Sequence, residues 1–85
     1  MKETIKKSVE GYKGVKVESV FVSDKKDYVG IIANAPKELT MRLASVKIFN
    51  KFPSIEFINW EGGWVNYAYT RRTLSHLGYN LKKSC

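Results

Sequence analysis

The segment from Ser54 to Thr70 constrains the fold most, because its residues predict two strands joined by a tight turn. The pair Gly62-Gly63 interrupts an alternating aromatic stretch, and a glycine pair between two such runs is typical of a two-residue hairpin loop. Two apolar faces result, one with Ile58, Trp60, Val65, Tyr67 and Tyr69 and the other with Ile55, Phe57, Trp64 and Ala68. The hairpin can turn only one of these faces to its own core. The other must be covered by another element, by a second subunit or by a ligand that accepts flat rings.

A second hairpin is predicted between residues 15 and 33. The upstream strand alternates, with Val15, Val17, Ser19, Phe21 and Ser23 on one side and Lys16, Glu18, Val20 and Val22 on the other. Asp24 to Asp27 form a polar tip, and residues 28–33 return as the antiparallel partner. With Lys25 and Lys26 as the loop, Gly30 lies opposite Phe21, whose ring can cover the missing side chain.

Three helices are predicted around these hairpins. The first spans residues 1–10, where Ile5 and Val9 form a narrow apolar stripe. The second runs from the first-turn residue Pro36 to about Asn50, and Pro53 stops it. Its core-facing rows are expected to be Leu39, Leu43, Val46 and Asn50, and Met41, Ser45, Ile48 and Phe52. Thr70 is expected to cap a third helix over residues 71–77, which Gly78 closes in the left-handed conformation.

The element order therefore predicts a two-layer α+β fold. Two hairpins separated and flanked by helices suit a four-stranded antiparallel sheet with the helices on one face. The 85 residues form one domain, with residues 80–85 as a basic tail.

Charge narrows the class of partner. Fifteen Lys and Arg residues against eight Asp and Glu residues give a net charge of +7, which favours nucleic acid, an anionic membrane surface or the acidic face of a protein. No apolar stretch approaches the roughly 18 residues of a membrane span. The single cysteine, Cys85, excludes an internal disulfide. We therefore expect a cytoplasmic protein with no membrane partner.

The sequence offers little for catalysis. It contains one histidine and one cysteine, and no Asp or Glu pair at metal-ligand spacing, so we expect no catalytic residue, no metal and no cofactor. One alternative is a small ribonuclease in which His76 acts as a base beside Arg71 and Arg72. The simpler interpretation of His76 is an ordinary surface residue.

Aromatic and basic residues supply the candidate nucleic-acid site. The rings able to stack on unpaired bases are Trp60, Trp64, Tyr67 and Tyr69, and the cations able to contact phosphates are Lys16, Lys25, Lys26, Arg71, Arg72, Lys82 and Lys83. The competing interpretation makes the rings core residues and the cations solubilising charge. The two sets can form one site only if they share a face.

In length, lysine excess and lack of a catalytic motif, the chain resembles the small basic accessory proteins of T-even-like bacteriophages. That resemblance implies an antitoxin-like inhibitor of a host ribonuclease toxin or defence system that also associates with RNA, and it assigns no role to any residue. We expect a non-enzymatic protein that binds RNA or another anionic partner. The alternative is a protein interaction module or homo-oligomer whose aromatic hairpin face is an interface.

Overall fold

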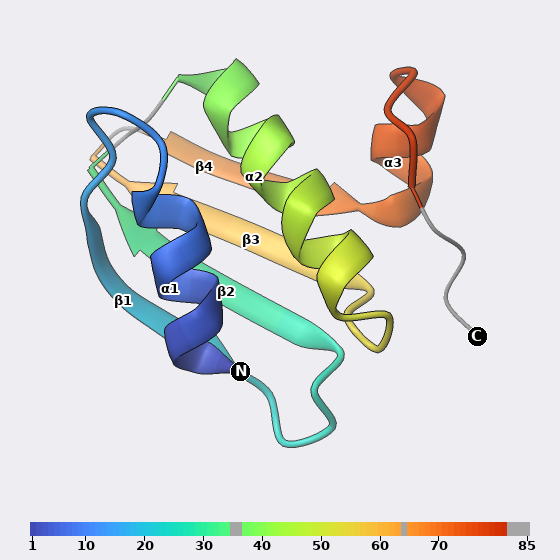
Figure 1. The fold of residues 1–85 in the computed structure, drawn as a ribbon, viewed down its shortest axis with the longest axis horizontal. Helices are drawn as coiled ribbons and strands as arrows, with labels where there is room; N and C mark the ends of the chain where they lie inside the picture. The colour runs from blue at the N-terminus through green and yellow to red at the C-terminus, as the bar shows by residue number, and fades with distance from the viewer. Residues whose placement is uncertain (35–36, 64, 82–85) are drawn as a thin grey trace.

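The computed structural model describes residues 1–34, 37–63 and 65–81 and shows an α+β fold (Figure 1). Its elements are α1 (Lys2–Glu10), β1 (Val17–Val22), β2 (Tyr28–Ala33), α2 (Glu38–Lys51), β3 (Phe57–Gly62), β4 (Val65–Thr70) and α3 (Arg71–His76). The predicted order of helices and hairpins is confirmed. The predicted helix start at Pro36 lies outside the described residues.

The four strands form a mixed sheet in the order β1-β2-β3-β4. The two hairpins are antiparallel pairs, but β2 and β3 run parallel, so the prediction of a fully antiparallel sheet was wrong at this pair. The 14 residues of α2 span about 21 Å, which matches the roughly 20 Å of a six-residue strand. The helix therefore carries the chain back along the sheet, and β3 begins at the same end as β2.

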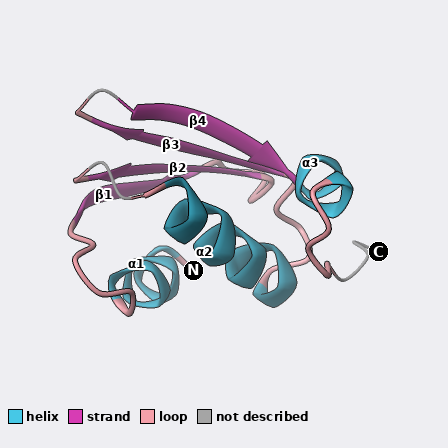
Figure 2. Cartoon of the chain, turned by 90° about the horizontal axis from the view of Figure 1, so that it is seen from above, coloured by secondary structure: helices cyan, strands magenta, loops and turns pink. Residues whose placement is uncertain are grey.

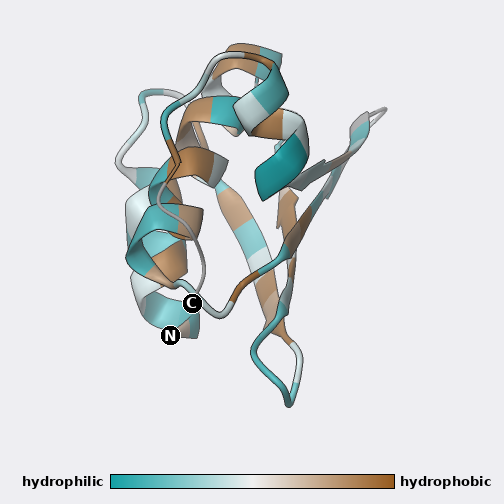
Figure 3. Ribbon diagram, turned by 90° about the vertical axis from the view of Figure 1, so that its right-hand side faces the viewer, coloured by the Kyte–Doolittle hydropathy of each residue, from teal (hydrophilic) through white to brown (hydrophobic). Residues whose placement is uncertain are grey.

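The helices α1 and α2 lie on one face of the sheet, and α3 lies beside α2 at the end of β4. Figure 2 shows the strands as one layer with α1 and α2 as the other, and Figure 3 shows the same arrangement from the side. Among the described residues, no element covers the opposite face, which we call the open face.

The first hairpin has the predicted register. Phe21 pairs with Gly30 and Val20 with Ile31, which confirms the expected placement of Phe21 beside the glycine. The register shifts between Val17 and Ser19, and such a bulge turns the residues that follow it to the other face. Val17 and Val20 are consequently both buried, and the strict alternation predicted for this strand was wrong.

The second hairpin is shifted by two residues from the predicted register. Gly62 pairs with Val65 and Trp60 with Tyr67, so Gly62 belongs to β3 and is not part of the predicted Gly62-Gly63 loop. Gly63 has a φ of 55°, a conformation that glycine adopts without steric cost. A shift of two keeps every side chain on its face, so Trp60 and Tyr67 still share one side of the sheet.

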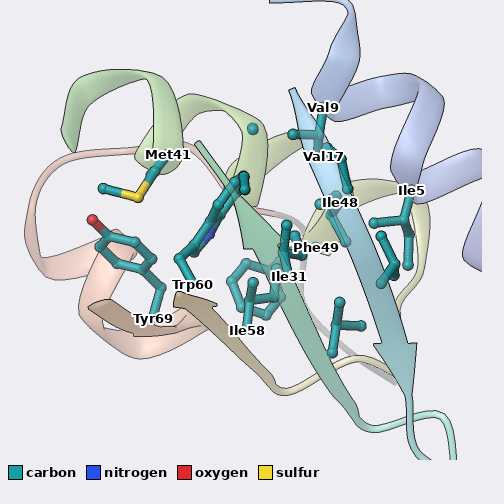
Figure 4. Packing of buried hydrophobic residues seen from close by; sticks show 14 of the residues in the cluster. Ile5, Val9, Val17, Ile31, Met41, Ile48, Phe49, Ile58, Trp60 and Tyr69 are labelled. Carbon is teal, nitrogen blue, oxygen red and sulfur yellow. The ribbon is translucent and has the colours of Figure 1, made fainter. Parts of the chain in front are cut away.

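Trp60 lies at the centre of the core (Figure 4). Its side chain is 1% exposed, and its indole Nε1 donates a hydrogen bond of 2.8 Å to the buried Ser45 Oγ on α2. The buried residues of α2 are Met41, Ala44, Ser45, Ile48 and Phe49. Leu39 and Leu43 are exposed, so the prediction that their row faces the core was wrong. The helix is turned so that the small residue Ser45 faces the bulky indole.

The ends of α3 are as predicted. Thr70 Oγ1 accepts a hydrogen bond from the Thr73 backbone N–H, and Gly78 has a φ of 97°. The Tyr79 N–H donates to the Leu74 carbonyl and the Gly78 N–H to that of Ser75, which is the Schellman pattern. The helix therefore begins directly where β4 ends.

We expect Ser45→Ala to lower the free energy of unfolding by about 1–3 kcal/mol, because it leaves the buried indole N–H of Trp60 without an acceptor. Urea unfolding followed by far-UV circular dichroism measures the change. Ala44→Ser, which changes the neighbouring buried position of α2 and keeps the Ser45 acceptor, is the comparison. An unchanged unfolding midpoint for Ser45→Ala would show that the hydrogen bond contributes nothing.

Candidate functional site

The open face carries three adjacent aromatic rings, one from each of three neighbouring strands. Tyr28 on β2 and Phe57 on β3 are paired residues, and their rings stack with centroids 5.4 Å apart and planes at 12°. The Phe21 ring on β1 meets Tyr28 edge-on at 6.0 Å. Phe21 is 57% exposed and the other two rings are half-buried. We call Phe21, Tyr28 and Phe57 the aromatic row.

A hollow lies beside the aromatic row, above Gly30. The strand registers place Phe21, Gly30 and Asn59 side by side, and Ser19, Ile32 and Glu61 in the next position along the strands. Because Gly30 has no side chain, a depression of about 170 Å³ remains between these neighbours. The Asn59 Nδ2 donates a hydrogen bond of 3.2 Å to the Glu61 Oε1 at its rim. We call this depression the Gly30 hollow.

Two of the predicted cations lie at the end of the sheet that holds the aromatic row. The tip of the β1–β2 hairpin carries Lys25 and Lys26, both exposed, and only Asp27 separates them from Tyr28. The tip is fixed to the segment preceding β3, because Ser54 Oγ donates to the Lys26 carbonyl at 2.9 Å and the Glu56 N–H donates to the Asp27 carbonyl at 2.8 Å. Figure 3 shows this hydrophilic tip projecting beyond the helices. These lysines therefore lie near the aromatic row, whose three rings were not in the predicted aromatic set.

The predicted aromatic set lies elsewhere. Trp60 and Tyr69 are buried under the helices, which corrects the prediction that they face a ligand. Burial raises the pKa of the Tyr69 phenol, so this side chain stays neutral. Tyr67 is 39% exposed on the helix side of the edge strand β4, with its ring 6.3 Å from that of Tyr69. Trp64 lies outside the described residues.

Arg71 is part of the scaffold. Its Nη2 donates a hydrogen bond of 3.0 Å to the Phe52 carbonyl, and its guanidinium carbon lies 5.0 Å from the centre of the Phe49 ring. Its Nε is 3.9 Å from Glu56 Oε2, and the side chain is only 11% exposed. Burial lowers the pKa of Arg71 while the Glu56 charge raises it. These contacts fasten α3 to the end of α2, which corrects the prediction that Arg71 serves a phosphate.

A third predicted cation lies near the end of the sheet that holds the aromatic row. Arg72 is exposed in the first turn of α3, which follows directly on Thr70, the partner of Phe57. Lys16 lies elsewhere: it is exposed, and its backbone N–H donates to Asn34 Oδ1 near the far end of the first hairpin. Lys82 and Lys83 lie outside the described residues.

The described residues offer no other obvious chemical centre. His76 is exposed at the end of α3. No group of three or more metal-ligating side chains occurs among the residues that the structure describes. None of the helices in this part of the chain is long and apolar enough to cross a membrane.

The aromatic row was not predicted from the sequence, although the strand pairing that places Phe21 beside Gly30 was. The predicted pairing of Phe21 with Gly30 already placed a large ring next to an empty position. The stacking of Tyr28 on Phe57 could not be predicted, because it depends on the parallel pairing of β2 with β3.

No protein-family model, curated protein or solved structure matches this chain.

Arg71 and Arg72 provide a matched test of scaffold against surface. We expect Arg71→Ala to lower the free energy of unfolding by about 1–3 kcal/mol, because it removes a partly buried hydrogen bond and a cation–π contact. Arg72→Ala should change it by less than about 0.5 kcal/mol, as is usual for an exposed side chain. Chemical unfolding of both variants measures the difference, and equal losses would contradict these assignments.

Proposed function

We propose that this protein is a non-enzymatic RNA-binding protein that holds an unpaired RNA strand against the open face of its sheet. The observation that carries the proposal is the aromatic row, three adjacent rings on a face of the sheet that no described element covers. Stacking of a base on an aromatic side chain is worth about 1–3 kcal/mol and tolerates any sequence.

The geometry of the row indicates which ring carries most of the stacking. One face of Tyr28 lies against Phe57, and Phe21 approaches Tyr28 edge-on. Part of the stacking surface of each ring is therefore already covered by a neighbouring ring. Phe21 is the most exposed of the three and stands next to the Gly30 hollow. We therefore assign the main base contact to Phe21.

The nearby charges support phosphate contact on a small scale. Lys25, Lys26 and Arg72 are exposed at the end of the sheet that holds the aromatic row, whereas Asp24 and Asp27 reduce the local charge. Three phosphate contacts predict a slope of about −2 in a plot of log affinity against log salt, at roughly 0.7 per contact for single strands. Stacking rather than charge should therefore dominate binding.

The biological role that we propose is the one implied by the phage resemblance, inhibition of a host ribonuclease toxin in the cytoplasm. An inhibitor that binds unpaired RNA can act on such a toxin by occupying its RNA. The size, net charge and absence of a catalytic motif in the sequence agree with this role.

We expect Phe21→Ala to weaken binding of a fluorescein-labelled single-stranded RNA by about 5- to 150-fold, the equivalent of one lost stack. Fluorescence anisotropy across a salt series measures both the affinity and its salt slope. Leu39→Ala is the matched control, because Leu39 is 60% exposed against 57% for Phe21 but lies on a helix rather than on the open face.

An equal loss in both variants would mean that the open face has no special role. A steep salt slope with no effect of Phe21→Ala would place the RNA on another, more basic surface. Absorbance at 260 and 280 nm before and after a high-salt wash adds an independent check, because RNA that copurifies and is released by salt raises the ratio.

A second candidate function is self-association through β4, and one observation favours it. β4 is an edge strand of the sheet, and its sequence from Val65 to Thr70 contains no charged residue and no proline. Such edges are ready to pair with another strand. The opposite edge, β1, carries Glu18 and a bulge that discourage pairing. Two β4 strands could pair across a two-fold axis without opposing charges.

For this candidate, we expect a dimer in sedimentation equilibrium that Ala68→Lys converts to a monomer, because it introduces a charge from each copy near the middle of the paired edge strands. Ser19→Lys, on the same face of the other edge strand, should leave the dimer intact. Unlike phosphate-led binding, this dimer should change little with salt. A wild-type monomer at every concentration examined would exclude the interface.

A further inference from the structure

The Gly30 hollow combines apolar walls with a polar rim. The side chains of Phe21, Tyr28 and Ile32 stand around the glycine, and Asn59 and Glu61 border it on the β3 side. Its volume of about 170 Å³ is below the roughly 300–1,000 Å³ of pockets for drug-sized ligands. The hollow is therefore of a size for one flat group that belongs to a larger ligand.

The rim offers acceptors to such a group. The Glu61 carboxylate is exposed and, when ionised, only accepts hydrogen bonds. Asn59 Nδ2 occupies one lone pair of Oε1, which leaves the second lone pair of that oxygen and the whole of Oε2. Within the described part of the chain, no cation lies at salt-bridge distance from Glu61. A ligand that presents two adjacent N–H donors would complement this carboxylate.

We propose that the Gly30 hollow holds one guanine base of the bound RNA, with the Watson–Crick edge of the base donating to the Glu61 carboxylate. This inference rests on the RNA-binding function proposed above. Guanine presents N1–H and an N2 amino group side by side on that edge, which matches two carboxylate oxygens. Adenine and cytosine place an acceptor nitrogen beside their amino group, and uracil flanks its single N–H with carbonyls, so each would set an acceptor against the carboxylate.

Gly30 makes the hollow accessible to a ring. A Cβ atom added at Gly30 would lie 3.6 Å from Tyr28 Cε1 and 3.7 Å from Phe21 Cβ, which are ordinary contact distances. The fold can therefore accept a Cβ atom at this position, and a side chain built on it would enter the space that the base would use.

The test uses labelled eight-nucleotide RNAs, all uridine except for one central position that carries guanosine, adenosine, cytidine or uridine. We expect the guanosine RNA to bind the wild-type protein about tenfold more tightly than the uridine RNA, the usual discrimination of one bidentate contact. Inosine, which lacks the N2 amino group, should lose most of that preference. 7-Deazaguanosine, which differs only on the edge that we leave unused, should keep it.

Two variants locate the preference. Glu61→Gln, an exposed substitution of the same shape, should bring guanosine and uridine RNAs to within about twofold of each other, because an amide offers one acceptor and one donor. Gly30→Val should weaken guanosine RNA selectively, with circular dichroism verifying that the fold is retained.

The outcomes separate this inference from the function on which it rests. Equal affinities for all four RNAs, with binding still lost in Phe21→Ala, overturn the guanine site and leave the RNA-binding function standing. A guanosine preference that survives Glu61→Gln also overturns it. No binding of any RNA at low salt overturns both.

Discussion

The packing of α2 against Trp60 is the contact on which the rest of the structure depends. The indole is buried between the helix and the sheet, and its N–H donates to Ser45 Oγ. An 85-residue chain has a small core, so one large side chain of this kind is a substantial part of its apolar burial. The position of α2 also carries the chain from β2 to β3 and so fixes their parallel pairing. That pairing in turn brings Tyr28 and Phe57 together on the opposite side of the sheet.

The open face is the candidate functional surface because the described helices cover only the other face of the sheet. A sheet face turned to water usually carries polar side chains. Here Phe21, Tyr28 and Phe57 cluster at one end, next to a glycine that exposes the backbone. The rings gain some burial from one another, yet Phe21 remains mostly exposed. Core packing therefore does not account for it, whereas contact with a ligand would.

Local signals in the sequence predicted what depends on neighbouring residues. The Thr70 cap, the left-handed Gly78 and the Phe21–Gly30 register follow from short stretches of chain, and all three are present. The two-residue shift of the second hairpin could not be predicted, because a period-two pattern is unchanged by a shift of two.

The remaining errors concern choices made by tertiary packing. The sequence of α2 has apolar residues nearly all round, so its pattern alone does not determine which side faces the sheet. The packing of Trp60 against Ser45 determines it. The same ambiguity led to Trp60 and Tyr69 being assigned to a ligand surface. Both faces of their hairpin are apolar, and only the side on which the helices pack decides which rings are exposed.

Several exposed cations lie on the helices and not beside the aromatic row, which limits what charge can do at the open face. Exposed lysines such as Lys6, Lys47 and Lys51 belong to α1 and α2, in the layer behind the sheet. Layers of packed structure are about 10 Å apart, which exceeds the roughly 8 Å Debye length at physiological salt. These lysines can attract a polyanion from a distance but contribute little once it lies against the sheet. An RNA on the open face would therefore be attracted by net charge and held in position by the rings.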